Sequence, residues 1–153
     1  MTDRKHRPLR LGRIRVEFYV KRAIKGTPTQ DLTNAFAPLK VSTAAATILD
    51  LIRYAKRIGG IARTVETLSP MLAHLRRIEL NQALTAENEV AAIQRLGFIL
   101  DTLGHEALAD LAKKHLPKRL NKVLLDSNQP NIDLQSTKPN RWAIIDNAKI
   151  GST

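Results

Sequence analysis

The chain has 153 residues, the size of one ordinary domain, and its lack of cysteine excludes disulfides, thiolate metal sites and a cysteine nucleophile. No apolar run approaches the ~18 residues of a membrane span, and no signal-peptide pattern follows the N-terminus, so we expect a cytoplasmic protein without a membrane partner. The formal net charge is +11, which has two interpretations: a nucleic-acid partner, or charged ends that keep the protein soluble.

The positive charge is concentrated at the two ends. Residues 1–25 carry nine Lys or Arg against two acids, residues 26–112 carry eight against nine, and residues 113–153 carry eight against three. Clustered cations release counterions when they meet phosphate. The ends are therefore where a nucleic-acid contact is expected.

The N-terminal part predicts a basic mobile arm and then a strand. Residues 1–10 have too few apolar side chains to bury, so we expect an arm that only a partner would order. From Arg13 to Lys21, apolar and polar residues alternate strictly, the pattern of a half-buried strand. Its buried face would be Ile14, Val16, Phe18 and Val20.

A turn and a first helix follow. The stretch Gly26–Asp31 has turn chemistry, and Leu39–Val41 predicts a short strand. Helix formers then run from Ala44 to Arg57, with Ser42 or Thr43 as the cap and Gly59-Gly60 as the end.

Further helices fill the middle of the sequence. A helical stretch begins at Ile61, and Ser69-Pro70 predicts a break or kink within it. Later helices are expected over Arg77–Leu84, Glu87–Leu103 and Glu106–Leu116, each with apolar residues at helical spacing.

The C-terminal part predicts two more strands, Val123–Leu125 and Arg141–Asp146, around a polar loop. The expected class is α+β, with several helices packed on one small sheet built from N- and C-terminal strands. Val16 and Ile144 would then lie in one sheet. We expect residues 11–150 to form a single domain.

The sequence gives little indication of a catalytic site. The four histidines lie at no metal-ligand spacing. A nuclease needs clustered carboxylates near a lysine, and Glu17 with Lys21 on one strand face is the nearest approach. We therefore expect no enzyme activity, no cofactor and no metal.

The basic arm and strand edge are the candidate nucleic-acid contacts. Their interaction would be non-specific and strongly salt-dependent, although a basic stretch can also be a linker that binds nothing. The candidate residues are Arg4, Lys5, Arg7, Arg10, Arg13 and Arg15.

Three sequence stretches occur in an informative order. The first is Leu39-Lys40-Val41-Ser42-Thr43 leading into Ala46-Thr47-Ile48-Leu49-Asp50-Leu51-Ile52-Arg53-Tyr54, the second is Gln94-Arg95-Leu96-Gly97-Phe98-Ile99-Leu100, and the third is Arg141-Trp142-Ala143-Ile144-Ile145-Asp146-Asn147. Over residues 11–150 the chain resembles the C-terminal, antitoxin-bearing region of AbiEi proteins. Ala44-Ala45 stand where that family has Pro-Glu, and the chain has no room for the winged-helix DNA-binding domain with which family members usually begin.

The resemblance implies an antitoxin module of a type IV, phage-resistance toxin–antitoxin system, related to AbiEi transcriptional regulators. Its functional partner would be a nucleotidyltransferase toxin, with which it need not form a stable complex. The alternative function is a basic nucleic-acid-binding accessory domain. The motif arginines Arg53, Arg95 and Arg141 could bind phosphate or carboxylate, or they could pair with Asp50 or Asp101 and cap carbonyls.

Overall fold

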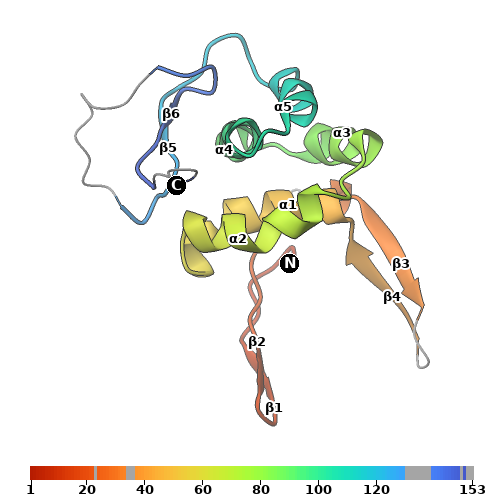
Figure 1. Cartoon of the computed structure of the whole chain (residues 1–153). Coiled ribbons are helices and arrows are strands. Elements are labelled where there is room, and N and C mark those ends of the chain that lie inside the picture. Colours follow the sequence, from red (N-terminus) through yellow and green to blue (C-terminus); the bar gives the residue numbers. More distant parts are fainter. Residues whose placement is uncertain (23, 34–36, 130–138, 149, 151–153) are drawn as a thin grey trace.

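In the computed structural model, five helices form a body from which two β-hairpins project (Figure 1). The structure describes residues 1–22, 24–33, 37–129, 139–148 and 150. The helices are α1 (Ala44–Arg53), α2 (Ile61–Leu72), α3 (Arg77–Ala86), α4 (Val90–Thr102) and α5 (Glu106–Lys113), with short 3₁₀ turns η1 (Ile24–Gly26) and η2 (Ala55–Arg57). The strands are β1 (Leu9–Leu11), β2 (Ile14–Val16), β3 (Thr29–Thr33), β4 (Pro38–Ser42), β5 (Val123–Leu124) and β6 (Ile144–Ile145).

The α+β class is confirmed, but the prediction of one sheet shared by both ends is wrong. The described strands form three separate two-stranded sheets, β1 with β2, β3 with β4, and β5 with β6. Val16 pairs with Leu9, whereas Ile144 pairs in parallel with Val123. Each strand pairs with a strand from its own end of the chain. For β2 the partner, β1, lies across a two-residue loop, and closing so short a loop costs little conformational entropy.

The alternating segment Arg13–Lys21 is not the half-buried strand that its pattern predicts. Only Ile14–Val16 is a strand, and the side chain of Ile14 is 64% exposed. Gly12 opens the loop at a φ of +61°, the positive value that two-residue hairpin loops need at this place. Leu9–Leu11 on the other side, partly within the predicted arm, forms β1.

Two other local predictions are wrong. Thr29–Thr33, which begins inside the predicted turn, is β3 and pairs antiparallel with β4. The break predicted at Ser69-Pro70 does not occur: helix α2 continues through Pro70 to Leu72, and the Ser69 hydroxyl donates to the Val65 carbonyl instead of capping a new helix. A kink at Pro70 stays a prediction. Most of the predicted polar loop, residues 130–138, lies outside the described residues.

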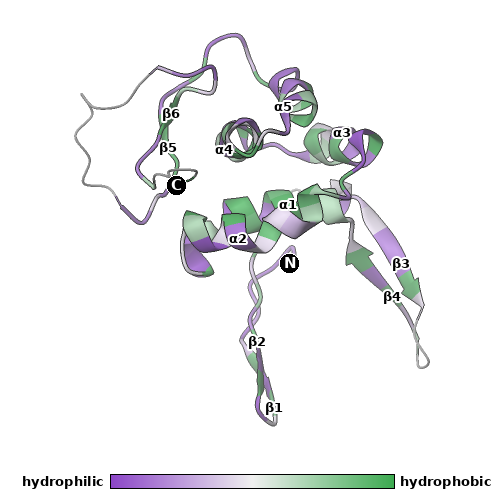
Figure 2. Ribbon diagram, viewed as in Figure 1, coloured by the Kyte–Doolittle hydropathy of each residue, from purple (hydrophilic) through white to green (hydrophobic). Residues whose placement is uncertain are grey.

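The remaining helix predictions are confirmed with small shifts of their ends. Thr43 caps α1 by accepting the Ala46 N–H, and Gly59 ends the region at a φ of +107°. The apolar faces meet inside the body (Figure 2). Its fully buried large side chains include Ile48, Leu49, Ile52, Ile61, Leu68, Leu80, Leu84, Leu96, Ile99, Leu100, Leu125 and Trp142. The core is thus helical, and Leu125 and Trp142 bring the C-terminal segment into it.

Candidate functional site

The first motif holds the root of the N-terminal hairpin against α1. Asp50 and Tyr54 lie four residues apart, so they share one face at the end of this helix. The Nζ of Lys21 is 2.7 Å from a carboxylate oxygen of Asp50, and both side chains are at most 10% exposed. The Tyr54 hydroxyl donates to the Val20 carbonyl at 2.6 Å. A buried ion pair and a hydrogen bond therefore fix residues 20–21 on the helical body.

Aromatic stacking strengthens the same attachment. The rings of Tyr19 and Tyr54 stack with centroids 5.3 Å apart, and the guanidinium of Arg57 lies 5.6 Å from the centroid of Tyr19. Glu17 accepts a hydrogen bond from the Tyr19 hydroxyl, which raises the pKa of that phenol. Thr2 adds backbone hydrogen bonds to residues 19 and 21. Both ends of the hairpin are therefore tied to one place.

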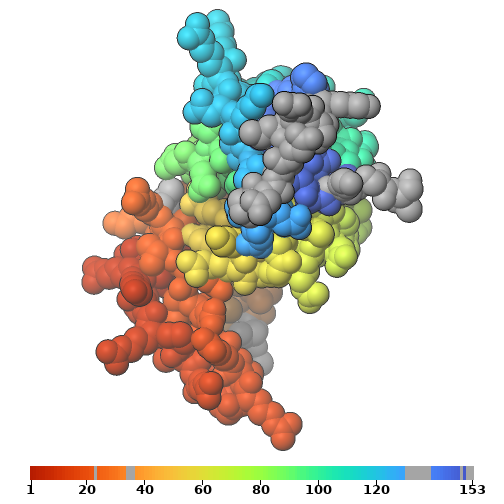
Figure 3. All heavy atoms as spheres, turned by 90° about the vertical axis from the view of Figure 1, so that its left-hand side faces the viewer, coloured from red at the N-terminus to blue at the C-terminus, as the bar shows by residue number. Residues whose placement is uncertain are grey.

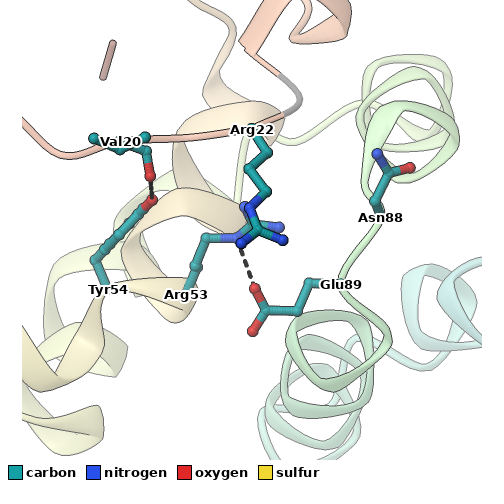
Figure 4. Close-up of a pocket in the computed structure, with 6 residues that line it drawn as sticks. All are labelled: Val20, Arg22, Arg53, Tyr54, Asn88 and Glu89. Atoms are coloured by element: carbon teal, nitrogen blue, oxygen red, sulfur yellow. Dashed lines mark hydrogen bonds and ion pairs between the residues drawn. The ribbon is translucent and has the colours of Figure 1, made fainter. Parts of the chain in front are cut away.

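A pocket of about 500 Å³ opens beside this attachment (Figure 4). It is lined by Val20, Arg22, Arg53, Tyr54, Asn88 and Glu89, from the hairpin root, the end of α1 and the connection between α3 and α4. The guanidinium of Arg53 pairs with Glu87 and, through Nε, with Glu89 at 3.1 Å. Two carboxylates therefore balance the more buried of the two arginines.

The pocket has limited capacity for an anion. Arg22 is exposed and has no ion-pair partner in the described part of the chain. The side chain of Glu87 is 1% exposed, and its Oε2 has no hydrogen-bond partner there. An incoming anion would meet one unpaired guanidinium and two carboxylates, so the local charge balance does not favour it.

The second and third motifs form one interface between α4 and the C-terminal segment. Gln94, Gly97 and Asp101 lie three and four residues apart on one face of α4. The Gln94 side-chain amide donates to the Trp142 carbonyl at 2.7 Å. A Cβ at Gly97 would lie 2.0 Å from the indole ring of Trp142, so only glycine fits there. The motif residues thus join this segment to α4.

Arg141 completes this interface with two acidic partners. Its guanidinium donates to both carboxylate oxygens of Asp101, at 2.8 and 2.6 Å, and to Asp110 at 2.6 Å. The Trp142 indole N–H also donates to Asp101. Hydrogen bonding from Arg141 lowers the pKa of the Asp101 carboxyl, and the same contacts raise the pKa of the guanidinium. Pairing with Asp101 is one of the alternatives that the sequence left open for the motif arginines, and Arg141 makes this pair.

The three motif arginines have separate partners. Arg95 donates through Nε to the Leu124 carbonyl at 3.0 Å, and burial lowers the pKa of its guanidinium. Arg53 pairs with glutamates, not with Asp50, whose partner is Lys21. Each arginine joins two segments of the fold. A role of Arg53, Arg95 or Arg141 in binding a ligand stays a prediction.

The candidate nucleic-acid residues lie on or next to the projecting hairpin (Figure 3). All six are exposed: Arg4, Lys5, Arg7, Arg10, Arg13 and Arg15. Arg15 pairs with Glu17 at 2.8 Å, and Arg4 lies 4.0 Å from Asp3. The other four have no ion-pair partner among the described residues. This is the main concentration of unneutralised charge at the N-terminal end.

Comparison with known proteins identifies the family. A family model described as AbiEi antitoxin C-terminal domain matches residues 1–102, two thirds of the chain. The chain belongs to this antitoxin family. Neither the search of curated proteins nor the search of solved structures found a match. The AbiEi match ends with α4, so it includes the α4 side of the interface with the third motif, whereas the third motif itself lies beyond the match.

Other candidate chemistry is not brought together in this AbiEi domain. Lys21 is 4% exposed and pairs with Asp50, whereas Glu17 is exposed and contacts Arg15 and Tyr19. Glu17 and Lys21 therefore do not share a site. The described residues contain no group of three or more His, Asp or Glu side chains that could hold a metal ion. None of their helices is long and apolar enough to cross a membrane.

Sequence reasoning missed the partners that organise the attachment and its pocket. Arg22 and Glu89 stood out in no motif, and Lys21 was assigned to an exposed strand face. The spacing of Asp50, Arg53 and Tyr54 does carry a signal, because three hydrogen-bonding side chains on one face of an otherwise apolar helix need polar partners. The spacing does not predict which residues those partners are. They come from residues 20–22 and 87–89 of the AbiEi domain.

Proposed function

We propose that this protein is the antitoxin module of an AbiE-type, type IV toxin–antitoxin system and counteracts a nucleotidyltransferase toxin. The family match over residues 1–102 is the observation that carries this proposal. The motif residues support it, because they make the contacts that hold both ends of the chain on the helices. In this chain the motif residues therefore make contacts that join separate segments of the fold.

We infer that the module acts in the cytoplasm without catalysis of its own. The pocket beside α1 is lined by the Arg53–Glu89 pair and by Arg22, and none of its lining residues is a nucleophile with a base beside it. Antagonism of the toxin would then depend on a surface. A stable complex is not required, since an antitoxin of this type can act on what the toxin modifies.

Co-expression tests this function. We expect a gene for a nucleotidyltransferase beside this one. Cells that express its product should stop growing, and expression of the present chain should restore colony formation. Trp142→Ala is the matched negative control, because removal of this buried ring should unfold the domain. Soluble, folded wild-type protein that leaves the cells arrested would contradict the proposal. Affinity capture of the tagged antitoxin should recover little toxin, and a stoichiometric complex would favour direct inhibition of the toxin over a type IV mechanism.

A second candidate function, binding of nucleic acid, is favoured by a specific observation. Four exposed cations of the N-terminal region have no ion-pair partner in the described chain: Lys5, Arg7, Arg10 and Arg13. Phosphates would supply the missing counter-charge and release their own counterions. Binding of duplex nucleic acid, measured across salt concentrations, tests this function. We expect affinity to fall steeply as salt rises, and no binding at low salt would contradict the function.

A further inference from the structure

The β1–β2 hairpin has two chemically different faces. Its register places Arg10 opposite Arg15, Leu9 opposite Val16, and Leu11 opposite Ile14. Directly opposed residues of an antiparallel pair point to the same face, and neighbours along a strand point to opposite faces. One face therefore carries two arginines, and the other carries four apolar side chains.

The arginine face is only partly neutralised. Like charges directly opposite each other destabilise a strand pair, and Arg10 has no carboxylate partner among the described residues. Arg15 has Glu17, but its side chain remains 58% exposed. Arg13 follows Gly12 in the loop and adds a third guanidinium at the tip. An external polyanion would relieve this repulsion.

The β1–β2 hairpin is positioned to reach such a partner. It projects from the helical body, and its far end touches none of the helices (Figures 1 and 3). The buried Lys21–Asp50 pair and the Tyr54–Val20 hydrogen bond fix its root. A ribbon anchored at one end and free at the other can enter a groove while the helical body stays outside.

We propose that the β1–β2 hairpin enters the major groove of B-form DNA with its arginine face toward the bases and phosphates. That groove is about 12 Å wide and admits a two-stranded β-ribbon, whereas the major groove of an A-form RNA duplex is too deep and narrow for side chains to read. Arginine offers a planar fork that suits both phosphate and the guanine edge. The proposal rests on the second candidate function and names its nucleic acid, its groove and its contact residues.

The experiment measures fluorescence anisotropy of a short labelled duplex DNA, and of an RNA duplex of the same sequence, with the full chain. The test variant is the triple substitution Arg10→Gln, Arg13→Gln and Arg15→Gln. The matched control, Lys114→Gln, Lys118→Gln and Arg119→Gln, removes the same charge from exposed positions at and beyond the end of α5. A second control, Leu11→Thr with Ile14→Thr, changes the apolar face at constant charge. Circular dichroism checks that all variants keep their helices.

The wild type should bind DNA at least about tenfold more tightly than RNA. The log of the affinity should fall linearly with the log of the salt concentration between about 50 and 200 mM. The slope of this line should be smaller by about two to three in the hairpin triple variant than in the wild type, near 0.9 for each arginine. In both controls the slope should change by less than about one.

The contrary outcomes separate the two levels of the proposal. Equal losses in the two triple variants, a larger loss in the apolar variant, or RNA affinity as high as DNA affinity would overturn docking by the hairpin while nucleic-acid binding stands. No binding of either duplex at about 50 mM salt would overturn both.

Discussion

The two ends of the chain are attached to the helices by different chemistry. The C-terminal segment is attached by burial, with the 1%-exposed Trp142 against Gly97 and a bidentate Arg141–Asp101 pair at the edge. The N-terminal hairpin is attached at its root, by the Lys21–Asp50 pair, the Tyr54 hydroxyl and the stacked rings of Tyr19 and Tyr54. Beyond that root, the apolar residues Leu9, Leu11 and Ile14 and the arginines of the hairpin are exposed.

This difference shows where the free charge of the protein lies. At the C-terminal attachment, Arg141 is neutralised by Asp101 and Asp110. At the N-terminal end, most of the cations have no such partner in the described chain. The family motifs therefore lie at the attachments, and the hairpin that extends beyond the N-terminal one carries exposed cations without ion-pair partners among the described residues.

The N-terminal attachment should give the largest stability effect. Lys21→Met leaves the Asp50 carboxylate buried without a counter-charge, so we expect a loss of about 3–5 kcal/mol in the free energy of unfolding. Chemical denaturation measures it. The double variant Lys21→Met with Asp50→Leu should recover most of the loss, and exposed Lys25→Met serves as the control. Equal stability of Lys21→Met and Lys25→Met would show that the buried pair contributes nothing.

The C-terminal attachment is tested by Gly97→Ala. The added Cβ would overlap the Trp142 ring, so the ring must shift, and we expect a loss of about 2–3 kcal/mol in the free energy of unfolding. The same change in a Trp142→Leu background should cost clearly less, because the overlapping ring atoms are gone. Identical costs in both backgrounds would contradict the packing of Trp142 on Gly97.

Asp101→Asn should have a smaller and pH-dependent effect. Arg141 lowers the pKa of Asp101 in the folded protein, so this carboxylate stabilises the fold above its unfolded pKa of about 3.9 and loses that contribution as pH falls through the lower folded value. We expect a loss of about 1–2 kcal/mol at neutral pH. Below pH ~4 the difference from wild type should shrink.

Denaturation across pH measures this contribution. Asp110→Asn is the control, since the Asp110 side chain is 62% exposed and receives one contact from Arg141. A constant difference between wild type and Asp101→Asn at every pH would contradict the assignment.

The smallest effect should be a gain in the stability of the β1–β2 hairpin. Arg10→Thr removes the repulsion from Arg15 and introduces a residue that favours strands, so the hairpin should be stabilised by about 0.2–1 kcal/mol. Amide hydrogen exchange of residues 9–16 should slow, while exchange in α4 stays unchanged. Faster exchange in the hairpin would show that the opposed arginines do not repel each other there.

The sequence predicted the helices because their periodicity is local. The cap at Thr43, the end at Gly59 and the strand at Leu39–Val41 follow from residues within a few positions, and the structure confirms them. The burial of Trp142 follows the same local logic, because a large aromatic side chain in an apolar run is usually part of the core.

The sheets and the N-terminal attachment could not be predicted in the same way. Alternation from Arg13 to Lys21 says which side chains share a face, but it does not say whether any layer covers that face. The burial of Lys21 depends on Asp50, 29 residues later. The pocket needs Glu87 and Glu89 from a third segment, and this proximity is a property of helix packing.

The central claim is that α1 holds the root of the basic hairpin on the helical body. A double-mutant cycle between Lys21→Met and Asp50→Leu, followed by chemical denaturation, tests it most directly. The account predicts a coupling free energy of at least about 2–3 kcal/mol between the two positions, because the double variant should recover most of the loss of either single one. Additive effects, with a coupling near zero, would contradict it and would leave the hairpin without the anchor described here.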